Sequence, residues 1–181
     1  TGIDQEIFDR ISEDGFEVRQ LPSAEITKSI VGLARILRQM GLLKNKHIPA
    51  IYLRASIEQR MELLRGLMDT DGYVAADGGC NFDNTKEHLV DGVWELLHSL
   101  GIRATKSERD ATLNGRIVGK SWRLTFTTSK QVFSLSRKRV RLNQRESAAT
   151  KWRYIVACEP IPSVPTRCIS VSSPTRMYLA G

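Results

Sequence analysis

Cysteine is scarce in this sequence of 181 residues, which contains only Cys80, Cys158 and Cys168. An odd number at such wide spacing favours neither a disulfide framework nor a zinc-binding CxxC pair, and it is more typical of a reducing compartment. Long apolar runs are also missing, so no segment is expected to span a membrane, and no basic-then-apolar leader opens the chain. These absences predict a globular protein of the cytoplasm.

Acidic residues become scarce in the second half of the chain. The formal net charge is +7, yet residues 51–100 carry a balance of −5 and residues 101–181 a balance of +12. Within residues 103–153 there are fourteen basic side chains and three acidic ones. A surface of one sign at that density favours a polyanion, because each neutralised phosphate releases counterions. The same charge also fits an ordinary soluble basic surface, so composition alone indicates nucleic acid without proving it.

The rest of the sequence divides into amphipathic helices and short strands. Apolar residues at helical spacing predict helices over residues 4–14, 27–40, 56–71 and 86–100. Ser56 and Gln59 form a capping box at the start of the third helix. Strands are expected over residues 16–20, 73–75, 80–83, 102–106, 116–118 and 121–127, followed by a basic segment over 132–145. From residue 151 the sequence is β-like and punctuated by prolines, so we place a boundary near residue 150.

The third predicted helix ends in an acidic stretch that reads Leu64-Arg65-Gly66-Leu67-Met68-Asp69-Thr70-Asp71-Gly72. Gly66 is expected to allow close approach of a neighbouring element. Carboxylates at a helix C-terminus are unfavourable, because that end carries a partial negative charge. A compensating cation is therefore expected, and a hard divalent ion with oxygen ligands is the natural candidate. Taken alone, residues 69–72 also fit a solvated turn between a helix and a strand.

Residues 64–72 resemble the second signature helix of the LAGLIDADG (DOD-type) homing endonucleases, in the double-motif form found inside inteins. Upstream, Lys46, Ile48 and Pro49 are similar to a block that these enzymes carry shortly before that helix. Residues 60–145 follow the family's order of helix, strands, helix and strands. The stretch 164–171, continuing through residues 173–174 and 177–181, resembles the penultimate β block of the Hint splicing domain of an intein.

The resemblance implies an α/β (α+β) fold in three parts. Residues 1–49 would be the remainder of a first LAGLIDADG repeat. Residues 50–150 would be a second αββαββα repeat with a curved antiparallel DNA-binding sheet, and residues 151–181 an all-β segment of the splicing domain. One signature helix is present where the family uses two, and the N-terminal intein block and the terminal His-Asn pair are absent. A fragment is therefore expected, with a single-motif homodimer as the alternative.

In this family each of two signature helices contributes one carboxylate to metal ions that bridge the scissile phosphates. The resemblance maps that role to Asp71, with Mg²⁺ as the cofactor, and gives Asp69 a structural role. Lys46 matches the basic residue near the metal site, although an exposed loop lysine also fits its position. Lys138 is the expected second catalytic lysine, and Arg137 is nearly as suitable. Because one carboxylate cannot build the shared centre, the chain by itself is expected to cut poorly.

Double-stranded DNA is the partner that the resemblance implies. The strands would lie along the major groove, where alternating side chains reach base edges. The candidate contacts, whose facing the sequence does not fix, are Asn81, Asp83, Arg116, Lys120 and Arg123. A basic cluster is expected to bind phosphates and consists of Arg137, Lys138, Arg139 and Arg141.

Cys168 occupies a position of the intein block where most inteins carry an acid and a subset carries cysteine. In that subset the thiol attacks the upstream splice junction, and a buried strand cysteine is the equal alternative. The resemblance thus implies site-specific cleavage of double-stranded DNA by an endonuclease nested in a self-splicing element, whose exteins are a host protein. Two alternatives stay open, namely a DNA-binding module of the same fold without cleavage, and an intein whose remaining activity is splicing.

Overall fold

Helix α4 (Ile57–Asp71) carries the acidic stretch and begins where the sequence predicts. The Ser56 hydroxyl accepts a hydrogen bond from the Gln59 amide at 3.3 Å, and the Gln59 side chain accepts one from the Ser56 amide at 3.2 Å. This confirms the capping box, which satisfies two donors that the first helical turn leaves free. The computed structural model describes residues 4–22, 24–142, 155–175 and 178.

An antiparallel sheet of four strands follows α4, in the order β3-β4-β6-β5. Its elements are β3 (Gly72–Val74), β4 (Cys80–Asn84), α5 (Glu87–Ser99), β5 (Ala104–Leu113), β6 (Arg116–Phe126) and the short α6 (Ser136–Arg139). The expected αββαββα order is therefore confirmed. The two short strands expected over residues 116–127 form one strand, and a register shift opposite Ala111 and Thr112 coincides with the break that the sequence suggested.

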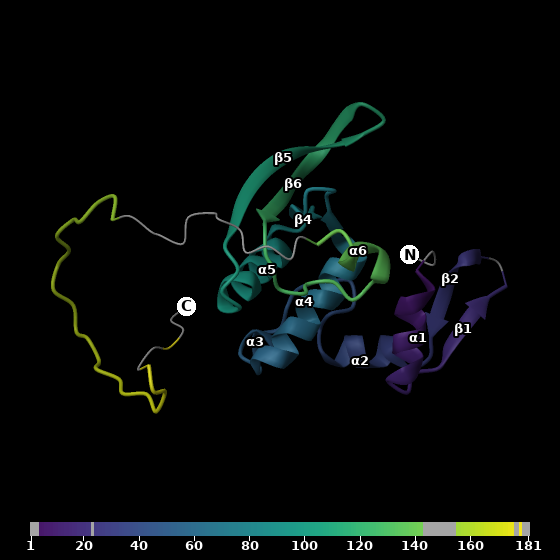
Figure 1. Ribbon diagram of the computed structural model, residues 1–181, viewed down its shortest axis with the longest axis horizontal. Helices are drawn as coiled ribbons and strands as arrows, with labels where there is room; N and C mark the ends of the chain where they lie inside the picture. The colour runs from purple at the N-terminus through teal and green to yellow at the C-terminus, as the bar shows by residue number, and fades with distance from the viewer. Residues whose placement is uncertain (1–3, 23, 143–154, 176–177, 179–181) are drawn as a thin grey trace. The chain divides into compact units, whose positions relative to one another are not determined.

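The β5–β6 hairpin extends well beyond the rest of the sheet, as Figure 1 shows. Strand β4 pairs with β6 only as far as Trp122, whereas β5 and β6 stay paired to Leu113 and Arg116. Asn114 and Gly115 join the strands with positive φ angles of 50° and 76°. Two such residues between paired strands make the type I′ turn that suits a twisted hairpin.

The core lies between this sheet and helices α4 and α5. Alternate residues in the inner part of the sheet point into it, and each of Val74, Cys80, Phe82, Leu124 and Phe126 is 3% exposed or less. Burial raises the pKa of the Cys80 thiol to about 12, so this cysteine stays protonated and acts as a small apolar side chain.

Residues 4–53 form a smaller set of elements beside this core. They are α1 (Gln5–Glu13), β1 (Val18–Leu21), β2 (Ala24–Ile30), α2 (Leu33–Gln39) and α3 (Ala50–Leu53). The helix predicted over 27–40 is wrong at its start, because residues 27–30 belong to β2 and Val18 pairs with Ile30. The β-branched Thr27 and Ile30 favour the strand, and Gly32, at φ 80°, separates it from α2.

The chain divides into two compact units, residues 1–147 and 148–181. In the second unit, residues 155–175 and Tyr178 contain no helix or strand, so the predicted all-β segment is not seen there. Residues 143–145 of the predicted basic segment and residues 177 and 179–181 of the intein-like stretch lie outside the described residues. Among the described helices, none combines the length and apolar character needed to cross a membrane.

The position of Phe82 predicts that the central strand dominates stability. Replacing Phe82 with alanine removes a fully buried ring and should lower the free energy of unfolding by about 4 kcal/mol. Urea denaturation measures this change. The control is Tyr73→Ala on the neighbouring strand, where the side chain is exposed and the expected change is below about 0.5 kcal/mol. Equal losses in the two variants would contradict the assignment of the core.

Candidate functional site

The acidic end of α4 separates its two aspartates by burial. Helical residues two positions apart point about 200° from each other around the axis, so Asp69 and Asp71 face opposite sides. Asp69 is 8% exposed, whereas Asp71, the last helical residue, is exposed. The structural role expected for Asp69 agrees with this burial, and Asp71 is the carboxylate that a ligand from solution can reach.

Asp69 binds the backbone of the segment that follows the sheet. Its Oδ1 accepts hydrogen bonds from the amides of Ser134 at 2.9 Å and Leu135 at 3.1 Å, and its Oδ2 accepts from Ser134 at 3.1 Å. Hydrogen bonds to an ionised acceptor are stronger than those between neutral groups. They hold the chain in place immediately before α6.

Lys138 lies at the same helix end and is only 6% exposed. Its Nζ donates to the carbonyl oxygens of Met68 at 2.8 Å, Asp69 at 2.7 Å and Gly72 at 2.6 Å. Burial lowers its pKa and the nearby Arg137 charge lowers it further, although the charges of Asp69, Asp4 and Asp71 act in the opposite direction. This geometry does not favour the predicted catalytic role or DNA contact of Lys138, because its three N–H donors already have protein acceptors.

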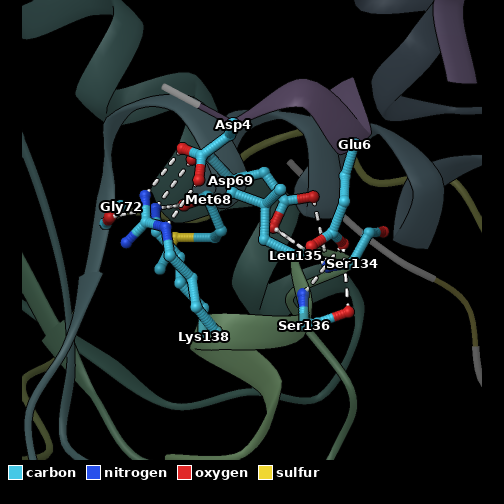
Figure 2. A network of polar contacts seen from close by, with 10 residues as sticks. Asp4, Glu6, Met68, Asp69, Gly72, Ser134, Leu135, Ser136 and Lys138 are labelled. Carbon is cyan, nitrogen blue, oxygen red and sulfur yellow. Dashed lines mark hydrogen bonds and ion pairs between the residues drawn. The ribbon is translucent and has the colours of Figure 1, made fainter. Parts of the chain in front are cut away.

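Helix α1 and its N-cap residue Asp4 contact the same segment. Arg137 donates to both carboxylate oxygens of Asp4, at 2.6 and 2.7 Å, and this pair holds the pKa of Asp4 below its usual value. Glu6 accepts hydrogen bonds from the amide and hydroxyl of Ser136 at 3.0 and 3.1 Å. Figure 2 shows these groups meeting Asp69 and Lys138 around the start of α6.

Asp71 and Lys46, the two residues assigned to the chemistry, are both exposed. Two contacts with α5 fix the loop that carries Lys46. The backbone carbonyl of Lys46 lies 2.8 Å from His88 Nε2, and Ile48 packs against Gly92. Within the described residues, neither side chain has a hydrogen bond or ion pair, and the two do not contact each other. No group of three or more His, Cys, Asp or Glu side chains in this part of the chain is arranged to hold a metal.

The face of α4 that carries Gly66 is open. A Cβ atom placed on Gly66 would meet no described atom within 4 Å, so the close approach expected there is not made within these residues. Thr70, one turn later on this face, is also exposed, and its hydroxyl bonds back to the carbonyl of Gly66 at 3.0 Å. The small residue thus leaves a shallow, uncovered strip along the helix.

The strand register decides the facing of the predicted DNA contacts. Asn81 pairs with Thr125 and Asp83 pairs with Arg123, and they alternate with the buried Cys80 and Phe82. They therefore occupy the face of the sheet away from the core, which we call the open face of the sheet. Arg123 Nε donates to Asp83 at 2.6 Å, and Thr125 donates to Asn81 at 2.9 Å.

Lys120 and Arg116 lie further out on the hairpin. Lys120 lies on the same face of β6 as the buried Leu124, which is the face opposite to that of Arg123. Its ammonium group forms ion pairs with Glu108 at 2.8 Å and Asp110 at 3.2 Å. Arg116, opposite Leu113, is exposed on the side of the open face.

Sequence reasoning missed further side chains on the open face. Ser107 lies opposite Arg123 and Thr105 opposite Thr125, and the exposed Arg109 follows on the same side of β5. Their alternation with Lys106 was visible in the sequence. The register that aligns them with Arg123 was not.

The structure divides the predicted phosphate-binding cluster. Lys138 is buried and Arg137 is paired with Asp4. Arg139 and Arg141 are exposed, and their side chains make no ion pair with any described residue. Those two arginines keep the charge that the cluster was expected to offer.

Cys168 is exposed and carries a free thiol. It lies in the second unit, in a stretch of residues without strand structure. The alternative of a buried strand cysteine therefore does not hold.

A model of the LAGLIDADG-like domain matches residues 58–148, which covers half of the chain. The replicative DNA helicase DnaB of Mycobacterium intracellulare is 40% identical over 161 residues. That match covers 87% of this chain and 28% of the helicase, so the chain spans little more than a quarter of its relative.

Among solved structures, the chain is similar to the homing endonuclease I-DmoI. A structure of that enzyme in complex with DNA and Ca is 12% identical, with a TM-score of 0.46, and the match covers 76% of this chain and 73% of the enzyme. A structure of its mesophilic variants is 13% identical, with a TM-score of 0.43, and the coverage is 76% and 63%.

The contrasting burial of the two aspartates gives a matched test. Asp69→Asn keeps one oxygen acceptor, replaces the other, which accepts from Ser134, with an NH2 donor, and removes the charge, so it should lower the free energy of unfolding by about 2 kcal/mol. Asp71→Asn makes the same chemical change at an exposed site and should alter it by less than about 0.5 kcal/mol. Chemical denaturation of both variants measures the difference. A reversed order would contradict the placement of these side chains.

Proposed function

This chain belongs to the LAGLIDADG-like domain family, and from that membership we propose that it is part of a site-specific endonuclease that cleaves double-stranded DNA. The observation that carries the proposal is the end of α4. It buries one aspartate of the family motif for structure and presents the next, Asp71, without a hydrogen bond or ion pair to a described residue. A carboxylate left in this way is available to a cation or to a partner.

Mg²⁺ is the cofactor that we propose. The described residues supply one acidic ligand, Asp71, so the rest must come from DNA phosphates, water and a second acidic helix end. Such an ion would stabilise the attacking and leaving oxygens of the phosphodiester. Lys46, on a loop anchored to α5, is the side chain that we propose to steady the phosphate.

The open face of the sheet is the proposed DNA surface. It offers donors and acceptors on neighbouring strands, such as Asn81, Arg123 and Thr125, in a layout that suits base edges in the major groove. Arg116 and Arg109 extend this surface along the hairpin. Arg139 and Arg141 supply charge for phosphates, which gives affinity without sequence information.

We propose that a second signature helix covers the Gly66 face of α4. It would come from a preceding repeat in the same protein or from a second copy of the chain. The order α1-β1-β2-α2 repeats the order α5-β5-β6-α6, which supports the division of residues 1–49 and 50–150 into two related repeats. The open strip at Gly66 is the place where the two helices would meet.

We further propose that the endonuclease is nested in an intein inside a DnaB helicase of the cytoplasm, whose halves are the exteins. The 40% identity to a DnaB sequence over a segment that is 28% of its length supports such an insertion. Residues 151–181 would belong to the Hint splicing domain. The exposed thiol of Cys168 is accessible to attack a splice junction in that setting.

One observation favours a DNA-binding module without cleavage as the second candidate. Lys138, which was expected to be the second catalytic lysine, is fully used in capping α4, so this half supplies one exposed candidate lysine, Lys46. Both candidates require the same DNA surface. They differ in whether Asp71 takes part in chemistry.

Cleavage of a plasmid library by the intact protein that contains this chain tests the proposal. Asp71→Asn should lower the cleavage rate by about 100-fold or more while DNA binding persists, because a metal ligand is lost. Glu95→Gln, an exposed carboxylate on α5 that is paired with Arg54, is the control and should cut normally. Binding without cutting by the unmodified protein would favour the second candidate, and equal cutting by Asp71→Asn would remove Asp71 from the chemistry.

The proposed phosphate contacts predict a steep salt dependence of duplex binding. Arg139→Ala and Arg141→Ala should each reduce the slope of log affinity against log salt by about one. Arg54→Ala is the control, since that arginine is paired with Glu95 on α5 and away from the open face. Fluorescence anisotropy over a salt series measures the slopes. A flat response in the unmodified protein would contradict a role for the basic surface.

A further inference from the structure

The C-terminal turn of α4 leaves carbonyl groups that no later helical residue can satisfy. The Gly72 amide bonds to the carbonyl of Met68, and Lys138 Nζ takes the carbonyls of Met68, Asp69 and Gly72 at 2.8, 2.7 and 2.6 Å. These acceptors lie on both sides of Asp71 in the chain. One buried ammonium group therefore ties the last helical turn to the first residue of β3, with Asp71 between them.

The junction between α4 and β3 has no loop to absorb movement. Asp71 is the last helical residue and Gly72 is the first residue of the strand. A Cβ atom on Gly72 would lie 2.6 Å from the Met68 carbonyl oxygen, so the two backbones approach as closely as glycine allows. The direction of the Asp71 side chain thus depends on how firmly this junction is held.

Lys138 is in turn held from outside α4. Glu6 and Asp4 of the α1 region bind Ser136 and Arg137, the two residues that precede Lys138. Figure 2 shows that these contacts and those of Lys138 belong to one continuous network. The position of the Lys138 ammonium group is therefore fixed both by α4, which it contacts directly, and by the α1 region, which binds the two residues before it.

We propose that Lys138 is a positioning residue for Asp71, acting through the backbone of the α4–β3 junction and not on the phosphate. The inference rests on the proposed function for the meaning of Asp71. It assigns to Lys138 a different task from the direct catalysis expected from the sequence.

A second lysine in the fold provides a matched comparison. Lys130 Nζ donates to the carbonyl of Leu100 at the end of α5, which is the same type of contact at another helix end. The last four residues of α5, 96–99, include no acidic residue, and Gly101 follows the C-cap residue Leu100. Loss of Lys130 should therefore lower stability without affecting the Asp71 site.

The test compares Lys138→Met, Lys138→Arg and Lys130→Met in the full chain by amide hydrogen exchange. Lys138→Met should speed exchange at residues 70–72 by roughly 30-fold, with less than about threefold change at residues 60–64. Lys138→Arg keeps the charge and donors and should restore most of the protection. Lys130→Met should leave residues 70–72 unchanged relative to the rest of α4.

In the intact protein, Lys138→Met should lower kcat for DNA cleavage by roughly 30-fold with little change in KM, and Lys138→Arg should recover it. A uniform rise in exchange along α4, or unchanged kcat despite a local rise, would overturn the proposal. If the unmodified protein does not cut DNA, the proposed function fails, and the exchange pattern still decides whether Lys138 holds the junction. Should Lys138→Met not fold, Asp4→Asn carries the test, because a rise of about threefold at residues 70–72 is expected and no change would contradict the proposal.

Discussion

The exchange of charged groups between α4 and α6 is the interaction on which the candidate site depends. Asp69 of α4 satisfies the amides that precede α6, and Lys138 of α6 satisfies the carbonyls that end α4. Each buried charge therefore has hydrogen-bond partners from the other element, which offsets the cost of removing it from water. An acidic helix end that would be unfavourable alone becomes a defined junction, and of its two carboxylates only that of Asp71 stays exposed.

Much of the secondary structure could be predicted from local sequence patterns. The capping box at Ser56 and Gln59 places the start of α4, and alternation places β4, because both depend on residues that are close in sequence. The role of Lys138 was not accessible in this way, since its acceptors lie about seventy positions earlier in the chain. The facing of Lys120 also depends on its pairing with Asp110, which the sequence does not fix. The helix expected over residues 27–30 failed because pairing with β1 outweighed the apolar spacing.

The basic side chains counted in the sequence differ in how available they are in the described part of the chain. Arg123 and Lys120 are paired with acids of neighbouring strands, and Lys138 is buried. Composition therefore does not show which basic side chains a polyanion could contact, whereas the structure leaves Arg139 and Arg141 exposed and without an ion pair to a described residue. Which basic side chains are exposed and unpaired depends on contacts between residues distant in sequence, and a count of residues does not reveal it.

The outer half of the β5–β6 hairpin stands apart from the core, with Leu113, Ile117 and Val118 each more than 60% exposed. Its shape is set by the Asn114-Gly115 turn and the ladder of backbone hydrogen bonds, so side chains there are not constrained by packing. Most changes of amino acid along this ribbon should consequently cost little folding free energy. Related proteins can therefore differ in the side chains that the outer hairpin presents to a partner while the core between the sheet, α4 and α5 is unchanged.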